Sequence, residues 1–151
     1  MFRGSHSVSL DAKGRFAIPG KVREQLESMG TNRVVVTLDH QEPCLQVYPP
    51  AVWQRIEERL RSVKGNNRRA RTVVRLLLGN SAECEWDGNG RILLPASARQ
   101  FAGLTKECVM MGLSDRLEIW DKTRWDEELE DYFNDPSAFG DLPDELQSFE
   151  S

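Results

Sequence analysis

Apolar and polar residues alternate in two stretches of the chain, residues 5–18 and 81–94. In both, apolar side chains occupy every second position and a glycine lies in the middle: Val8, Leu10, Gly14, Phe16, Ile18 and Cys84, Trp86, Gly90, Ile92, Leu94. A period of two is typical of strands that bury one face, and the glycine indicates a turn between them. The pattern therefore predicts two half-buried β-hairpins.

The two predicted hairpins are copies of one motif, 76 positions apart. Residues 11–19 read Asp-Ala-Lys-Gly-Arg-Phe-Ala-Ile-Pro, and residues 87–95 read Asp-Gly-Asn-Gly-Arg-Ile-Leu-Leu-Pro. In each copy the Asp and the Arg have the opposite parity to the apolar residues, so they belong to the face turned away from the core. The chain is therefore built on an internal repeat.

The elements expected after the first hairpin recur after the second. A short helix, two strands and an amphipathic helix are predicted first in residues 20–28, 33–38, 45–48 and 50–61, and again in residues 96–102, 108–111, 117–120 and 123–133. A further helix is predicted over residues 69–78, and an irregular tail beyond Asn134. We divide the chain into a first repeat (5–51), linking helices (52–80), a second repeat (81–124), and a C-terminal helix with an acidic tail (125–151).

Charge is unevenly distributed along the 151 residues, whose formal net charge is −4. Residues 121–151 hold 11 acidic and 2 basic residues, whereas residues 59–75 hold seven basic residues and no acidic one. The basic run is interpreted as a solvated helix face, or as a surface that meets the acidic C-terminal helix of the same or a neighbouring subunit; a second DNA-binding patch is the less favoured interpretation. No apolar run reaches the length of a membrane span, so no membrane association is expected.

An enzyme is not expected from the residue pattern. The two histidines stand apart without metal-ligand spacing, and no Cys–His arrangement suggests a nucleophile and its base. The three cysteines form no CxxC pair, which favours core positions in a protein of the reducing cytoplasm. We therefore expect no catalytic residue, metal or cofactor.

The motif Asp-x-x-Gly-Arg-apolar-x-apolar-Pro resembles the SpoVT-AbrB DNA-binding domain, and two copies in one chain resemble the MraZ family. The Met-Phe-Arg-Gly opening and the run Leu-Leu-Leu-Gly-Asn-Ser-Ala-Glu-Cys at residues 76–84 are similar to that family as well. The resemblance implies an α+β, mainly β fold: tandem AbrB-like swapped-hairpin half-barrels that form an intramolecular pseudo-dimer, with peripheral helices. It further implies a closed homo-oligomeric ring.

The resemblance also implies a function. Members of the family act as transcription factors, generally repressors, on short tandem repeats of double-stranded DNA upstream of their own division and cell-wall gene cluster. A cytoplasmic, nucleoid-associated regulator follows as the expectation. The alternatives are an AbrB-like antitoxin or protein-interaction module that acts through its acidic C-terminal region, and a purely structural ring protein.

The motif also yields candidate DNA-binding residues. An arginine at the foot of a hairpin can present its planar fork to guanine, and a lysine beside it can contact a phosphate. The competing interpretation is that the two aspartates cap their own turns and merely pair with the arginines, a contact that is worth little on an exposed surface. The predicted DNA-binding residues are Arg15, Lys13, Arg91, Asn89 and, more weakly by its position before the first strand, Arg3; the residues that orient the turns are Asp11, Gly14, Asp87 and Gly90. Because Asn89 stands where the first copy has Lys13, the second turn is expected to attract phosphate less strongly.

Overall fold

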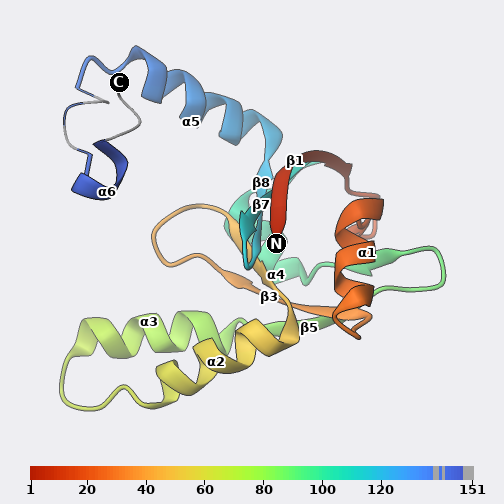
Figure 1. Ribbon diagram of the computed structural model, residues 1–151, viewed down its shortest axis with the longest axis horizontal. Coiled ribbons are helices and arrows are strands. Elements are labelled where there is room, and N and C mark those ends of the chain that lie inside the picture. Colours follow the sequence, from red (N-terminus) through yellow and green to blue (C-terminus); the bar gives the residue numbers. More distant parts are fainter. Residues whose placement is uncertain (138–139, 141, 148–151) are drawn as a thin grey trace. The chain divides into compact units, whose positions relative to one another are not determined.

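A computed structural model of the chain describes residues 1–137, 140 and 142–147. The chain forms two compact units, Met1–Asp121 and Lys122–Ser151. The first unit contains eight strands and four helices: β1 (Phe2–Ser9), β2 (Arg15–Ala17), α1 (Gly20–Ser28), β3 (Arg33–Leu38), β4 (Leu45–Tyr48), α2 (Pro50–Arg61), α3 (Arg68–Gly79), β5 (Ala82–Glu85), β6 (Arg91–Leu93), α4 (Ala96–Ala102), β7 (Glu107–Ser114) and β8 (Leu117–Asp121). The elements are α+β and mainly β, as predicted (Figure 1).

The strands of the two repeats are interleaved. Six of them form one antiparallel sheet in the order β1-β7-β8-β4-β3-β5, and β2 pairs with β6 in a separate two-stranded ribbon. Since β1–β4 come from the first repeat and β5–β8 from the second, the first strand of each repeat pairs with the third strand of the other. The order reads the same from either end once equivalent strands are exchanged. This arrangement is the intramolecular pseudo-dimer of swapped hairpins that the resemblance implied.

The two halves of the sheet, β1-β7-β8 and β4-β3-β5, meet along β8 and β4 in its middle. Gln46 of β4 faces Glu118 of β8 in the register of this pair. The two residues occupy equivalent places in their repeats, 72 positions apart, so they lie at the pseudo-twofold axis. The Gln46 side chain is almost fully buried, with 5% of the residue exposed.

The ribbon formed by β2 and β6 buries one face in the core. Phe16 of β2 lies opposite Ile92 of β6, and both are buried. Just beyond the ribbon, the Ile18 backbone N–H donates to the Gly90 carbonyl (2.9 Å) and the Leu94 N–H donates to the Gly14 carbonyl (3.0 Å). These bonds attach each repeat to the turn of the other. The ribbon is therefore anchored by its apolar face, and its opposite face is left for polar contacts.

Four helices surround this β-structure. Each of the helices α1 and α4 begins directly after a proline, whose fixed φ suits a helix start, and each buries apolar residues in the core: Val22, Leu26, Ala98 and Ala102. The helices α2 and α3 follow one another as a hairpin (Figure 1). The Thr37 hydroxyl of β3 donates to the Leu77 carbonyl of α3 (2.7 Å), which attaches α3 to the sheet.

Three predictions of local structure were wrong. The two alternating stretches were predicted to be hairpins, but β1 pairs with β7, β5 with β3, and β2 with β6, because the strands are exchanged between the repeats. The first strand begins at Phe2 rather than near Ser5, because β7 pairs with it residue by residue from Ser114 to Glu107 and Phe2 is buried. Arg3 thus lies within β1 and not before it. The second unit contains α5 (Lys122–Asn134), and a single helical turn, α6 (Asp144–Gln147), lies within the tail predicted to be irregular. Asp144 and Glu145 occupy the first turn of α6, where negative charge is favourable.

Part of the predicted acidic tail, at residues 138–139, 141 and 148–151, lies outside the described residues. Among the helices that the structure describes, none combines the length and the apolar character needed to cross a membrane.

Candidate nucleic-acid interface

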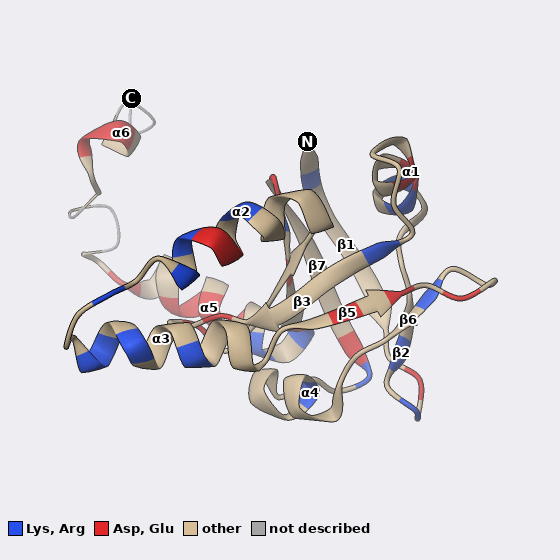
Figure 2. Ribbon diagram, turned by 90° about the horizontal axis from the view of Figure 1, so that it is seen from below, with Lys and Arg blue, Asp and Glu red and all other residues tan. Residues whose placement is uncertain are grey.

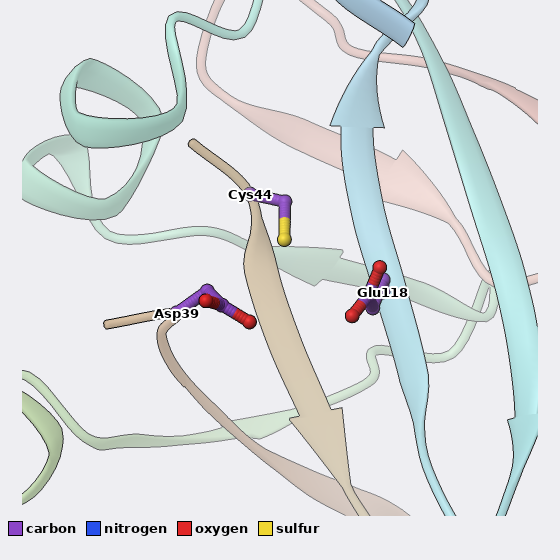
Figure 3. A group of neighbouring side chains, drawn as sticks. All are labelled: Asp39, Cys44 and Glu118. Atoms are coloured by element: carbon purple, nitrogen blue, oxygen red, sulfur yellow. The ribbon is translucent and has the colours of Figure 1, made fainter. Parts of the chain in front are cut away.

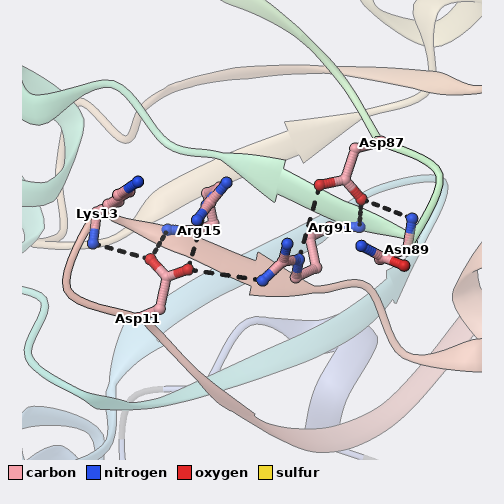
Figure 4. A network of polar contacts seen from close by, with 6 residues as sticks. All are labelled: Asp11, Lys13, Arg15, Asp87, Asn89 and Arg91. Atoms are coloured by element: carbon pink, nitrogen blue, oxygen red, sulfur yellow. Dashed lines mark hydrogen bonds and ion pairs between the residues drawn. The ribbon is translucent and has the colours of Figure 1, made fainter.

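Each motif turn is organised by its own aspartate. Oδ1 of Asp11 accepts hydrogen bonds from the backbone N–H groups of Lys13 and Arg15, both at 2.9 Å (Figure 4). The second copy repeats this geometry: Oδ1 of Asp87 accepts from the N–H groups of Asn89 (2.8 Å) and Arg91 (3.0 Å). Each aspartate thus accepts hydrogen bonds from two backbone N–H groups of its own turn.

The glycine of each turn has a positive φ, 87° at Gly14 and 72° at Gly90. This left-handed conformation is one that residues with a side chain rarely adopt. The Gly14 N–H donates to the Asp11 carbonyl (3.0 Å), and the Gly90 N–H donates to the Asp87 carbonyl (2.9 Å). The glycine thus closes the turn and sets the direction in which the following arginine leaves it.

The two motif arginines converge on Asp11. Oδ2 of Asp11 lies 3.2 Å from Nε of Arg15 and 3.9 Å from a terminal nitrogen of Arg91 (Figure 4). Asp87 holds Arg91 less closely, with 3.6 Å between Oδ2 and Nε, and that Nε is a buried donor with no hydrogen-bond acceptor in the described structure. Asp11 therefore positions both arginines, whereas Asp87 positions one.

The electrostatics of both carboxyl groups favour the charged form. Hydrogen bonds from the backbone N–H of Arg15, and then of Lys13, lower the pKa of Asp11, and the Arg15 side chain lowers it further. The N–H groups of Arg91 and Asn89 likewise lower the pKa of Asp87, with a smaller effect from the positive charges nearby. Both aspartates thus stay ionised at neutral pH and keep the turns and arginines in place.

The solvent face of the ribbon carries four side chains in two cross-strand pairs. Arg15 lies opposite Leu93, and Ala17 lies opposite Arg91. Leu93 is 55% exposed, although it is a large apolar residue within a strand. The ribbon thus presents two arginines and two apolar residues on one side, while Phe16 and Ile92 face the core.

Arg23 of α1 and Arg99 of α4 complete the surroundings of the turns, and they were not among the predicted site residues. A Cβ added at Gly14 would overlap the Arg99 guanidinium, and one added at Gly90 would overlap that of Arg23. Nε of Arg99 also donates to the Leu94 carbonyl (3.3 Å). Each arginine therefore lies over the turn of the other repeat. Their separation of 76 positions is the motif offset, and this spacing is the signal that could have identified them.

The remaining predicted residues are Lys13, Asn89 and Arg3, of which Arg3 lies apart from the turns. Lys13 and Asn89 are exposed at the tips of the first and second turns. Arg3 lies on β1 and lines a hollow together with His6 and Lys21. At the rise of a β-strand, Arg3 is about 20 Å from the end of β1 that leads into the first turn. Arg3 is thus separate from the group that surrounds the ribbon.

The predicted basic run occupies the end of α2, the connection to α3 and α3 itself, where basic residues follow one another along the helix (Figure 2). The Asn67 side chain caps the start of α3 by accepting from the Ala70 N–H (3.1 Å). The cationic side chains of α3 are exposed, as expected for a solvated face. Its pairing with an acidic helix stays a prediction.

One group of possible metal-ligating residues occurs among the described residues: Asp39, Cys44 and Glu118, whose ligand atoms lie within 4.8 Å of one another (Figure 3). The amide nitrogen of Gln46 donates to both carboxylates, to Asp39 at 2.6 Å and to Glu118 at 2.7 Å. Arg116 in turn donates to the Gln46 carbonyl oxygen (3.0 Å). The amide thus supplies the donor that two neighbouring carboxylates need, and the cluster is explained as a hydrogen-bonded brace across the pseudo-twofold axis.

The three cysteines are buried, free thiols, as the sequence suggested. Burial raises the pKa of Cys84 to about 11 and that of Cys108 to about 12, and it raises the pKa of Cys44 further with the help of the carboxylates around it. Since the thiolate is the reactive form, these side chains act as small core residues at neutral pH.

The chain matches a family model described as "MraZ protein, putative antitoxin-like" over residues 1–76 and 77–141. It is similar to proteins named "Transcriptional regulator MraZ" from Tolumonas auensis (43% identity, 99% of each chain), Nitrosospira multiformis (45%, 99% of each) and Pseudoalteromonas translucida (49%, 85% of each). The two family-model matches abut between residues 76 and 77, within α3.

Proposed function

Because the chain belongs to the MraZ family, as matches over nearly its whole length establish, we propose that it is a transcriptional regulator that binds DNA through the solvent face of the β2–β6 ribbon and its two turns. The observation that carries the proposal is the convergence of Arg15 and Arg91 on Asp11. Two half-exposed guanidinium groups are held side by side at the surface, each positioned by a carboxylate that does not itself need to touch DNA.

This arrangement suits recognition in the major groove, which is wide enough to admit a two-stranded ribbon. Arg15 and Arg91 would donate in bidentate fashion to guanine O6 and N7. Lys13 at the tip of the first turn would contact a phosphate and set the register, and Asn89 would do so more weakly in the second. Arg23 and Arg99 add positive charge beside the turns. The second turn therefore has more positive charge near it than its own sequence suggested.

The proposed targets are short tandem repeats upstream of the protein's own division and cell-wall gene cluster, where binding would repress transcription in the cytoplasm at the nucleoid. A single ribbon reads few bases and binds weakly. In a closed homo-oligomeric ring, adjacent subunits would meet adjacent repeats, and linkage of this kind raises avidity by about 10²–10⁴. Arg3, which lies on β1, would contribute at most a separate backbone contact.

Fluorescence anisotropy tests the proposal with DNA from upstream of the protein's own gene and a scrambled fragment, over a salt series. Arg15→Ala should lose about 1–3 kcal/mol of preference for the native fragment, the range of one bidentate base contact. Arg33→Ala is the matched control: this exposed arginine pairs with Glu83 (3.8 Å) on the large sheet and is not part of the β2–β6 ribbon. Light scattering and thermal unfolding would show whether assembly and folding are unchanged.

The outcomes separate three functions. A preference for the native fragment that Arg15→Ala loses and Arg33→Ala keeps supports a sequence-specific regulator. Equal binding to both fragments, steeply weakened by salt, indicates phosphate contacts alone and contradicts base recognition by Arg15. Absence of binding favours the second candidate, a protein-interaction module, for which the antitoxin-like description of the family is the supporting observation. That candidate requires a stoichiometric partner protein in a pull-down.

A further inference from the structure

We propose that Leu93 is a specificity-determining residue that contacts the 5-methyl group of a thymine about one or two base pairs from the guanine read by Arg15. The inference rests on the proposed function, because it assigns a base to a residue of the same ribbon. Leu93 is a large apolar side chain that is 55% exposed, whereas its neighbours Ile92 and Leu94 are buried.

The register of the ribbon places Leu93 on the recognition face. Leu93 is the direct cross-strand partner of Arg15, and directly opposed residues of an antiparallel pair point to the same side. Their Cβ atoms are about 4.5–5.5 Å apart in such pairs. That separation corresponds to one or two base steps of about 3.4 Å. A leucine beside an arginine bound to guanine would thus reach the adjacent base pair or the one after it.

Only one base offers an apolar group to such a residue. In the major groove, thymine presents its 5-methyl group, while the other bases present hydrogen-bond donors and acceptors. The ribbon is also unequal in its two halves: Ala17 occupies the place that Leu93 has in the second repeat, opposite Arg91. The methyl of Ala17 is too short to make the same contact. The Arg15–Leu93 pair would therefore read guanine and thymine together, whereas the Arg91–Ala17 pair would read guanine with less selectivity beside it.

The test removes the methyl group from the DNA and the side chain from the protein. The native upstream fragment is prepared with thymidine or with deoxyuridine, which differs from thymidine only in lacking the methyl group. Each fragment is titrated with wild type, Leu93→Ala and Leu129→Ala. Leu129 is a control leucine on α5, outside the motif, and is 37% exposed. We expect wild type and Leu129→Ala to bind the deoxyuridine fragment about fourfold more weakly for each thymine methyl that Leu93 covers, the equivalent of one buried methyl group. Leu93→Ala should bind both fragments equally.

Three results would overturn the assignment while leaving the proposed function intact. The first is equal binding of both fragments by the wild type, which would show that the ribbon contacts no thymine methyl group. The second is a preference for thymine that persists in Leu93→Ala. The third is an altered oligomer size of Leu93→Ala with unchanged DNA discrimination, which would assign Leu93 to a contact with a second copy of the chain. The proposed function itself would fail differently, by absence of binding to the thymine fragment in the wild type.

Discussion

Replacement of Gly14 by alanine tests whether Arg99 holds the turn of the opposite repeat. Gly14 has a φ of 87°, and a Cβ there would meet the Arg99 guanidinium. The left-handed conformation costs a residue with a side chain about 1–2 kcal/mol. Because the overlapping atoms end a flexible side chain, Arg99 would swing aside rather than force the backbone to move. It would lose its hydrogen bond to the Leu94 carbonyl, a further cost of about 1 kcal/mol.

Gly30 provides the matched control, since its φ is 80° and a Cβ there would meet no atom within 4 Å. Both substitutions incur the cost of the left-handed conformation, and both reduce the entropy of the unfolded chain, so these contributions cancel in the comparison. We expect Gly14→Ala to lower the free energy of unfolding by about 2–3 kcal/mol and Gly30→Ala by about 1–2 kcal/mol. The measurement is urea unfolding at one fixed protein concentration, because assembly makes apparent stability depend on concentration.

The double variants decide the cause of the difference. Arg99→Ala should destabilise the wild-type protein by about 1 kcal/mol and the Gly14→Ala protein by almost nothing, because the alanine has already displaced the arginine. Equal destabilisation by Gly14→Ala and Gly30→Ala, or an undiminished effect of Arg99→Ala in the Gly14→Ala background, would refute the proposed contact between α4 and the first turn.

Two further predictions concern the turn aspartates. Asp11→Ala should weaken binding to the upstream DNA more than Asp87→Ala, because Asp11 contacts both arginines and Asp87 only one; anisotropy would contradict this if the two variants were equally impaired. Folding lowers the pKa of each carboxyl group. The stability that each group contributes is therefore present at a pH above its pKa in the unfolded chain, about 3.9, and is lost as the pH falls through its pKa in the folded protein. NMR titration of the side-chain carboxyl groups should therefore give midpoints below about 3.9 for both, and a midpoint above it would show that the turn hydrogen bonds do not persist in solution.

The parts of the fold that depend on residues close together in the sequence could be predicted from it. Pro19, Pro49 and Pro95 delimit strands and start helices, and alternation around each turn glycine separated the buried face of the ribbon from the exposed one. That Asp11 and Arg15 lie on the face turned away from the core was predicted from the alternation of positions alone. These features are local, so periodicity and turn chemistry suffice to predict them.

Contacts between the two repeats could not be predicted in this way. The beginning of β1 depends on the length of β7, which lies in the other repeat, far along the chain. The position of Arg99 over Gly14, and of Arg23 over Gly90, arises because the hairpins are exchanged. Periodicity predicted a hairpin in each repeat and did not predict the pairing of β2 with β6. Hydrophobic alternation marks which face of a strand is buried but does not identify the strand beside it.

The residues at the pseudo-twofold axis make the two halves of the molecule unequal partners. Gln46 and Glu118 face each other there, and the amide donates directly to the carboxylate. A homodimer of the second half alone would oppose two carboxylates across its central strand pair, and like charges directly opposite are destabilising. A homodimer of the first half would avoid that repulsion but would lack the Glu118 carboxylate as the acceptor across the strand pair. Each half therefore fits the other better than it fits a copy of itself, and separation of the fused chain into independent halves would favour a heterodimer over either homodimer.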